Sequence, residues 1–458
     1  MINPDICHKA RLARDSRFDG LFFTAVKSTG IFCRPICPAR APAEHQVCYY
    51  PSAAAASAAG YRPCLRCRPD SAPGSAAWQG SNTTLQRAIR LIDDGGLQQQ
   101  TQHDLACRLG ITERYLRKLF QQHLGMPPKQ YALAQQVLFA KKLLHETTMP
   151  VNHIAFHAGF NSVRRFNDAF KQQLKLSPLN IRRQNKASGD MLQLTLSYRP
   201  PLAWQQMLDF WRARTLEGID WVDAQRYGRT FSFMQQPGWF VVEPAANNNL
   251  KLQLHWPGEQ GLFSLVQHLR RLLDLDANLL HIEQQLTSHP LFSQGIISGL
   301  RIPGVWSSWE AGVRAVLGQQ VSVAGARTQL NRLVQALGKP LETDGMSIRL
   351  FPSPQALASS DLQMIKVPQA RRDTLKALAQ FVLQQSDAAP EHWLAIKGIG
   401  PWTVSYARLR GLSDTDVWLG GDLGVQKALA KAGNNGDINA LAPWRSYATF
   451  QLWFSLGA

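Results

Sequence analysis

TGIFCRPIC at residues 29–37 and CLRC at residues 64–67 decide the fold of the front of this chain. They form a C-x3-C pair and a C-x2-C pair with 26 residues between them. Two close cysteine pairs on one small domain are the spacing of a tetrahedral zinc site, which binds its ligands as thiolates. We therefore predict one Zn²⁺ ion and no organic cofactor, with the ligands Cys33, Cys37, Cys64 and Cys67. Because a thiolate is also a nucleophile, one of these ligands is also a candidate reagent.

Length and charge limit what the rest of the chain does. With 458 residues, 45% of them hydrophobic, the chain has room for three or four domains with cores of their own. Residues 1–190 hold 26 Lys and Arg against 12 Asp and Glu, a net of +14, whereas residues 191–458 hold 24 against 20, a net of +4. A basic front half predicts a polyanionic partner, and we expect double-stranded DNA.

No signal peptide and no run of about 18 apolar residues is found, which predicts an intracellular protein with no membrane partner and no disulfides.

Changes in composition and periodicity divide the chain into four expected domains. Polar stretches at 69–82 and 184–190 are typical of linkers. Alternating apolar residues predict strands at 192–198, 230–234 and 250–255, accompanied by helices at 204–214 and 262–274. We expect a multidomain chain of mixed class: a small α/β zinc domain at 1–77, an all-α tandem helix-turn-helix at 82–185, an α+β domain with an antiparallel sheet at 191–285, and an all-α helix–hairpin–helix domain at 286–458.

The helical region contains a repeat with an offset of 49 residues. Leu105-Ala106 followed by Gly110 matches Ile154-Ala155 followed by Gly159, and each glycine precedes a helix-capping residue, Thr112 or Ser162. A helix, a glycine turn and a second capped helix predict two helix-turn-helix units, joined by a connector helix at 129–145. The second helices carry the DNA-contacting candidates Arg114, Arg117, Arg164 and Arg165. The alternative is a plain helical bundle with solvated basic faces.

Three further cysteines, Cys7, Cys48 and Cys107, lie outside the two pairs and lack a partner at ligand spacing. Cys107 is expected on the core side of the first helix-turn-helix, as a small buried apolar residue. Cys48 and His45 are kept as alternative zinc ligands, although four better-spaced cysteines compete with them.

The residues around the cysteine pairs carry a family resemblance. The matching elements are Asp19-Gly20, Thr29 to Cys37, and Gly60 to Asp70. They resemble the N-terminal zinc domain of the Ada adaptive-response regulators. The resemblance implies that Cys33 accepts a methyl group from a DNA methylphosphotriester. Arg34, Arg62, Arg66 and Arg68 are candidate phosphate contacts in this basic segment, and the alternative for some of them is a solvated side chain.

The tandem helical units resemble the AraC-type DNA-binding domain, which follows the zinc domain in Ada regulators. This resemblance implies a transcription activator that works with RNA polymerase, and whose DNA affinity depends on the methylation of Cys33.

The back of the chain contains a hairpin signal and a single carboxylate. Gly398-Ile399-Gly400 lies between two helical patterns, and its tight turn exposes backbone amides that can hold a DNA phosphate. About 20 residues later, Gly420-Gly421-Asp422 places one aspartate before a helix. Asp422 is a candidate catalytic group, and the alternative is a helix N-cap.

These elements, with residues 312–323 and 409–411, resemble the helix–hairpin–helix DNA glycosylases, above all the AlkA-type 3-methyladenine glycosylases, over about residues 191–458. The resemblance implies that Asp422 is catalytic and that Trp402, Tyr406 and Trp453 receive the flipped base. It places Gln320 where the family has an apolar wedge, and Gly420-Gly421 where a family member has a proline and a first aspartate. Lyase-competent relatives have a lysine where this chain has Trp402, so we expect a monofunctional glycosylase.

We therefore expect a fused protein of the bacterial cytoplasm, located at the nucleoid. It would accept methyl groups from methylphosphotriesters, activate transcription and excise alkylated purines. Two alternatives stay open: a transcription regulator whose glycosylase-like half only binds DNA, and a zinc-thiolate redox sensor. Direct reversal of O6-methylguanine is not expected, because no Pro-Cys-His-Arg string occurs and no cysteine follows Cys107.

Overall fold

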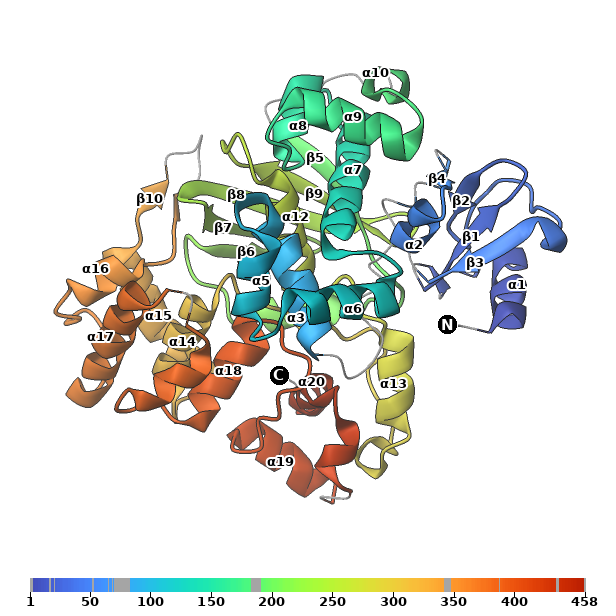
Figure 1. Ribbon diagram of the computed structural model, residues 1–458. Coiled ribbons are helices and arrows are strands. Elements are labelled where there is room, and N and C mark those ends of the chain that lie inside the picture. Colours follow the sequence, from blue (N-terminus) through green and yellow to red (C-terminus); the bar gives the residue numbers. More distant parts are fainter. Residues whose placement is uncertain are drawn as a thin grey trace.

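The computed structural model describes residues 3–15, 18–19, 21–51, 53–64, 66–67, 69, 83–182, 191–341, 347–386, 388–433 and 436–456. In Figure 1 a small β-rich domain near the N-terminus lies beside a helical region, a central sheet follows, and helices form the C-terminal part. No helix among these residues has both the length and the apolar character needed to cross a membrane.

The N-terminal domain is α/β, as predicted. Its sheet has the order β3-β1-β2-β4, in which β1 pairs antiparallel with β2 and β3, and β2 pairs parallel with β4. The strands are β1 (Phe23–Val26), β2 (Ile31–Cys33), β3 (Val47–Tyr50) and β4 (Arg62–Pro63), and the helical segments are α1 (Pro4–Leu12), η2 (Glu44–Gln46) and α2 (Ala53–Ala58). The parallel pairing of β2 with β4 brings the two cysteine pairs to the same end of the sheet.

The next region contains the two predicted helix-turn-helix units. The helices are α3 (Thr83–Asp93), α4 (Gly96–Gln99), α5 (Gln102–Arg108), α6 (Glu113–Leu124), α7 (Pro128–Glu146), α8 (Val151–His157), α9 (Val163–Leu174) and α10 (Pro178–Ile181). Gly110 and Gly159 adopt φ of +68° and +89°. The side chains of Thr112 and Ser162 then accept hydrogen bonds from the first turns of α6 and α9. The repeat and the connector helix α7 are therefore confirmed.

The third region is built on an antiparallel five-stranded sheet of order β5-β9-β8-β7-β6. Its elements are β5 (Leu192–Ser197), α11 (Trp204–Arg212), β6 (Asp220–Val222), β7 (Tyr227–Phe233), β8 (Gln236–Ala245), β9 (Asn249–His255) and α12 (Leu262–Leu272). The expected strands and helices are present, and β6 and β8 are strands that we did not predict. Strand β8 was not predicted because Pro237 and Gly238 at its start are residue types typical of turns.

The C-terminal region is helical, as predicted, with one exception. Its elements are α13 (Leu279–Thr287), η5 (Pro290–Phe292), α14 (Ser308–Gly318), α15 (Val323–Leu337), β10 (Pro340–Leu341), β11 (Ile348–Arg349), α16 (Pro354–Ala358), α17 (Gln369–Gln384), η6 (Pro390–Ala395), α18 (Pro401–Gly411), α19 (Leu423–Lys431), η7 (Ile438–Leu441) and α20 (Arg445–Ser455). The exception is the short pair β10–β11, so the region is not strictly all-α. Helix α13 also runs across the boundary that we predicted at 285/286.

The second helix-turn-helix unit and the central sheet share one hydrophobic core. Phe139 of α7 packs against Phe263 of α12 with 5.3 Å between ring centroids. The same connector helix covers the edge strand β5: Thr195 donates its backbone N–H to Glu146 over 2.9 Å, and its carbonyl accepts from Lys142. Pairing an edge strand with charged side chains satisfies backbone groups that water would otherwise bind. The regulator-like front is therefore packed onto the back half and is not merely tethered to it.

Candidate metal centre and candidate active site

The four predicted zinc ligands come together in the N-terminal domain. Ligand atoms of Cys33, Cys37, Cys64 and Cys67 all lie within 4.8 Å of one another. Cys33 ends β2, and Cys64 follows β4 and donates its backbone N–H to Phe32 over 2.9 Å. Cys64 and Cys67 are buried, whereas Cys33 and Cys37 are partly exposed. A reagent must reach DNA, so the exposed pair contains the better candidates for a nucleophile.

The chemistry of these four thiols fits a divalent cation. The hydrogen bond with Cys37, together with Cys64 and burial, raises the pKa of Cys33, and the hydrogen bonds with Cys33 and the other two thiols raise that of Cys67. The hydrogen bond with Cys33 lowers the pKa of Cys37 to about 7 and also lowers that of Cys64. Neighbouring thiols in this cluster thus shift one another's pKa in opposite directions, because deprotonation of one disfavours deprotonation of the next. All four can be thiolates together only when a cation compensates their charge. Zn²⁺ with four cysteine ligands meets this requirement.

The alternative ligands and the remaining cysteines lie apart from this cluster. The group contains neither Cys48, which is on β3 opposite Ala25, nor His45. Our expectation for Cys107 is wrong: its side chain is exposed, with Sγ 3.5 Å from His103 Nε2. Cys107 follows the buried Leu105 by two positions and the buried Ala106 by one, which turns it to the outer face of α5.

The phosphate contact predicted for Arg34 also needs correction. Arg34 is buried, and its Nε donates to Oδ1 of Asp19 over 2.8 Å while Nη2 contacts Oδ2. Its Nη1 donates to the carbonyl of Cys67 over 3.3 Å, so its charge is used inside the domain. Arg66 is exposed and Arg62 is partly exposed, and Arg68 lies outside the described residues.

The DNA-contacting candidates of the helical units lie on exposed helix faces. Arg114, Arg164 and Arg165 are exposed, and so is Arg117, which also pairs with Glu113 over 3.1 Å.

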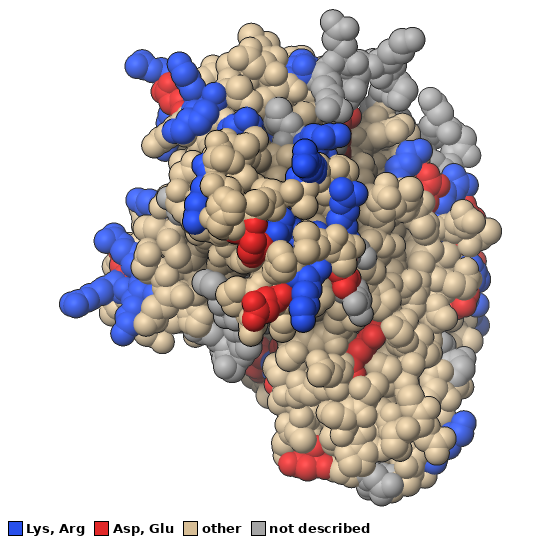
Figure 2. Space-filling view, turned by 90° about the vertical axis from the view of Figure 1, so that its right-hand side faces the viewer, with Lys and Arg blue, Asp and Glu red and all other residues tan. Residues whose placement is uncertain are grey.

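Figure 2 shows the side of the molecule on which the N-terminal domain lies in Figure 1. Lys and Arg gather in its upper part, at the level of α8–α10 and the N-terminal domain, and are sparse in the lower part.

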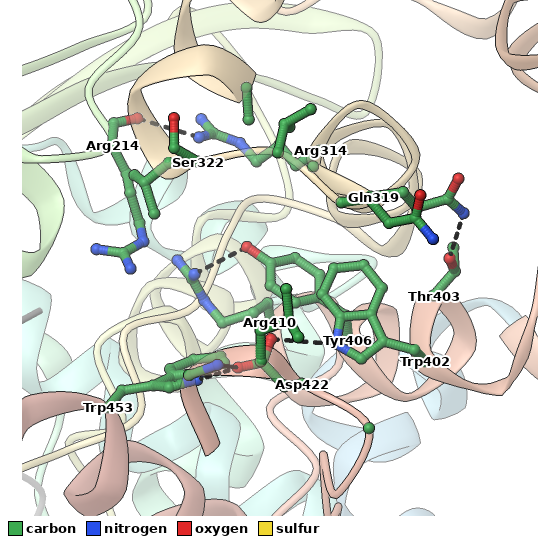
Figure 3. A pocket seen from close by; sticks show the side chains of 18 of the residues that line it. Arg214, Arg314, Gln319, Ser322, Trp402, Thr403, Tyr406, Arg410, Asp422 and Trp453 are labelled. Carbon is green, nitrogen blue, oxygen red and sulfur yellow. Dashed lines mark hydrogen bonds between the residues drawn. The ribbon is translucent and has the colours of Figure 1, made fainter. Parts of the chain in front are cut away.

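A second candidate site is a cavity of about 910 Å³ between the α+β region and the C-terminal helices. Asp422 lies in its wall and caps α19, because Oδ1 accepts from the backbone N–H groups of Gly424 and Val425 over 2.9 and 3.1 Å. Two indoles hold the same carboxylate: Trp453 donates to Oδ1 over 2.9 Å and Trp402 to Oδ2 over 3.2 Å (Figure 3). The N-cap and the candidate catalytic role therefore belong to one side chain.

The predicted aromatic residues line this cavity. Trp402 and Tyr406, one turn apart on α18, stack with 5.4 Å between ring centroids. Trp453 comes from α20 and is 8% exposed, so most of its ring is packed into the protein. Figure 3 shows the indoles of Trp402 and Trp453 directed at Asp422, whereas the hydroxyl of Tyr406 is directed at Arg410.

Sequence reasoning missed the cations of the cavity. Arg410 donates to the hydroxyl of Tyr406 over 3.2 Å, and the guanidinium of Arg214 lies 3.7 Å above the ring of Phe210. Both line the cavity together with Arg314. Arg410 could have been noticed four residues after Tyr406 on the same helix, but nothing in the sequence connects Arg214 with Asp422.

The predicted hairpin lies at the rim of the cavity. Gly398 has φ of +91°, and a Cβ there would stand 2.2 Å from Oγ1 of Thr374, so only glycine fits. Gly400 precedes α18 and lines the cavity. Gln319 ties this turn to α14 by donating to the Gly398 carbonyl over 3.1 Å, and its neighbour Gln320 is exposed at the rim with φ of +55°.

Comparison with known proteins finds a relative that matches almost the whole chain. It is 37% identical to the "Probable bifunctional transcriptional activator/DNA repair enzyme AlkA" of Mycobacterium tuberculosis H37Rv over 476 aligned positions, which cover 98% of this chain and 96% of the relative. The chain belongs to this family of fused activators and repair enzymes.

Partial relatives match each half of the fused family separately. The DNA-3-methyladenine glycosylase 2 of Escherichia coli is 31% identical over 57% of this chain and 97% of its own length. The "Bifunctional transcriptional activator/DNA repair enzyme Ada" of the same species is 39% identical over 29% of this chain and 35% of its own length. Family models match at residues 6–70 (metal binding domain of Ada), 105–184 (helix-turn-helix domain) and 193–307 (AlkA N-terminal domain).

Proposed function

We propose that this chain detects and repairs alkylated DNA with two separate chemistries. Its front half accepts a methyl group from a DNA methylphosphotriester on Cys33 and activates transcription in the methylated form. Its back half excises alkylated purines of the 3-methyladenine type as a monofunctional glycosylase. The observation that carries the excision activity is the Asp422 carboxylate, held by two indole N–H groups in the wall of a cavity that can admit a base.

Methyl transfer is a direct displacement. Zn²⁺ bound by the four cysteines would keep Cys33 as a thiolate at neutral pH. The Sγ lone pair forms a bond to the methyl carbon, the carbon–oxygen bond breaks, and the oxygen keeps the pair as a phosphodiester anion. The product is a thioether that ordinary reduction does not reverse, so each molecule acts once. Cys33 is the candidate through the resemblance to the Ada zinc domain, and its partial exposure at the end of β2 is compatible with this role.

Methylation changes the charge next to DNA. Four thiolates around one Zn²⁺ carry a formal −2, and one thioether reduces this to −1, which lowers the repulsion of the phosphate backbone. Lys141 of the connector α7 contacts the carbonyl of Cys64 over 3.4 Å, so the cysteine cluster touches the helix that joins the two helix-turn-helix units. This contact supports communication between the cysteine cluster and the DNA-reading helices α6 and α9. The methylated regulator would bind promoter DNA at the nucleoid through these helices and act on RNA polymerase.

Base excision uses the groups around Asp422. A flipped alkylated purine is electron-poor, so it stacks favourably on Trp402 and Tyr406. The C1′–N bond breaks with its electron pair on the base, and the Asp422 carboxylate stabilises the positive charge that develops on the sugar. Water then adds its oxygen to C1′ and releases a proton, which leaves an abasic site. Gln320 at the rim would fill the gap in the duplex.

One experiment tests both chemistries. The full chain is incubated with alkylated duplex DNA, and mass spectrometry identifies the released bases and the methylated cysteine. We expect free 3-methyladenine and methyl on Cys33. Methyl on Cys33 without any released base would instead support a regulator whose back half only binds DNA.

A further inference from the structure

We propose that the N-terminal zinc domain holds the excision site in position through a buried polar relay. The relay runs from Cys67 through Arg199 to Tyr447 and Trp453, so that methylation of Cys33 slows base excision at Asp422. This inference rests on the proposed function and adds a coupling between its two chemistries.

The first step joins Cys67 to Asp19 through Arg34. The backbone N–H of Arg34 donates to Sγ of Cys67 over 3.3 Å, and its guanidinium holds the Cys67 carbonyl and the Asp19 carboxylate together. Arg34 is adjacent to Cys33 in the chain, so a change at the Cys33 sulfur reaches Arg34 directly.

The second step crosses from the zinc domain to the α+β region. Arg199 is 1% exposed, and its Nε donates to the backbone carbonyl of Asp19 over 3.0 Å, although 180 residues separate the two in sequence. A charged donor inside the protein is costly to leave without an acceptor, so the two parts must stay in register.

The third step reaches the C-terminal helices. Arg301 is fully buried and donates to the carbonyls of both Arg199 and Asp274. The Asp274 carboxylate accepts from the hydroxyl of Tyr447 over 2.9 Å. Each link joins two charged or strongly polar groups, and such bonds are the stronger ones in a protein interior.

The last step lies within one helix. Tyr447 and Trp453 are six residues apart on α20, whose residues 446–453 are all buried. A packed helix moves as a rigid body, so a displacement at Tyr447 also displaces Trp453. The indole of Trp453 donates to Asp422 over 2.9 Å. Asp422 is thus fixed in part by groups that begin in the zinc domain.

A methyl group on Cys33 disturbs the start of this relay. The ligand atoms of the four cysteines lie within 4.8 Å of one another, so an added methyl displaces its neighbours. The loss of one negative charge also weakens the attraction of Arg34 to the cluster. Because the relay is assembled on the unmethylated centre, displacement loosens it and Asp422 becomes less well held.

A coupling between the two sites is a free energy, and here it is measured as the ratio of excision rates of the unmethylated and the methylated protein. The full chain is methylated on a duplex that carries one methylphosphotriester and no damaged base, and DNA is then removed at high salt. Single-turnover excision of 3-methyladenine is measured at saturating protein, where the rate no longer depends on DNA affinity. We expect the unmethylated protein to be about five-fold faster, at the lower end of usual allosteric couplings.

Two variants interrupt the relay at different points. Tyr447→Phe removes the hydroxyl that binds Asp274 and keeps the ring, and Arg199→Lys keeps the charge without the same reach. Both should bring the ratio of unmethylated to methylated rates close to one. A purely structural defect would lower both rates equally and leave the ratio unchanged. The control Asp94→Asn breaks the 2.6 Å ion pair with Arg271, which also joins front and back halves but lies off the relay, and should preserve the ratio.

Amide hydrogen exchange supplies a second readout. Methylation should speed exchange in α20 of the wild type and not in Tyr447→Phe. A rate ratio of one in wild type with Cys33 fully methylated overturns the relay but leaves both proposed activities intact. A ratio that persists in both variants also overturns it. If no methyl reaches Cys33, the proposed front-half activity fails first, and the relay fails with it.

Discussion

Trp453 donates its indole N–H to the Asp422 oxygen that also caps α19. This one oxygen therefore accepts three hydrogen bonds, while the other accepts only from Trp402 within the described residues. The capping bonds fix where the carboxylate stands, and its remaining face lines the cavity. A structural N-cap and a catalytic carboxylate are compatible here, because preorganisation of a charge is what stabilises a developing cation.

Asp422→Asn should abolish excision with little loss of stability. The amide oxygen still caps α19, but the negative charge is gone, so the excision rate should fall by about 10²–10³-fold, the usual loss when one electrostatic stabiliser of a transition state is removed. Quantification of released 3-methyladenine checks this. Asp437→Asn is the matched control, because Asp437 caps η7 and does not line the cavity. Wild-type excision by Asp422→Asn would remove Asp422 from the mechanism.

Trp453→Phe should slow excision while damaged DNA still binds. The phenyl ring fills most of the space, but Oδ1 loses a donor, and a hydrogen bond to a charged group is worth about 1.5–3 kcal/mol. We expect a roughly ten-fold lower single-turnover rate. Trp204→Phe is the control, since its indole donates over 2.7 Å to the Gln225 carbonyl, away from Asp422. Equal rates for both variants would mean that the indole does not position the carboxylate.

Cys33→Ser should prevent methyl uptake, whereas Cys107→Ser should not affect it. Serine at position 33 offers neither a thiolate nucleophile nor a good zinc ligand, so zinc content should also fall. Cys107 is exposed and apart from the cluster, which makes it a matched control. Methyl transfer from labelled methylphosphotriester DNA and elemental analysis give the two readouts. A label that stays on the protein in Cys33→Ser would identify another acceptor.

The sequence was sufficient for local features of the sites. The paired cysteines, the capped turns at Thr112 and Ser162, and the Gly398 hairpin depend on short-range spacing, and the structure contains all of them. Features that depend on distant partners were not accessible. Arg34 looked like a phosphate contact because its acceptor, Asp19, lies 15 residues away with nothing to mark the pair.

Contacts between the regions were missed for the same physical reason. Arg199 bonds Asp19, and Thr195 bonds Glu146 of the connector helix. Each partner is unremarkable in its own stretch of sequence, and only the packing of one region on another brings the pair together. The composition therefore suggested two halves joined by a linker, whereas the structure has the second helix-turn-helix and the central sheet in one core.

Gly398→Ala should weaken both stability and DNA binding. A Cβ at this position lies 2.2 Å from Oγ1 of Thr374, and φ of +91° is strained for any residue with a side chain. We expect a loss of about 1–3 kcal/mol in unfolding free energy, the usual cost of such strain. The hairpin turn must also shift, so its backbone amides no longer face a phosphate together. Thermal unfolding and titration of abasic-site DNA measure the two effects. Gly400→Ala provides the comparison, because its φ is −111° and a Cβ there meets no atom within 4 Å. It should keep wild-type stability, and an equal destabilisation of both variants would contradict the role that we assign to Gly398.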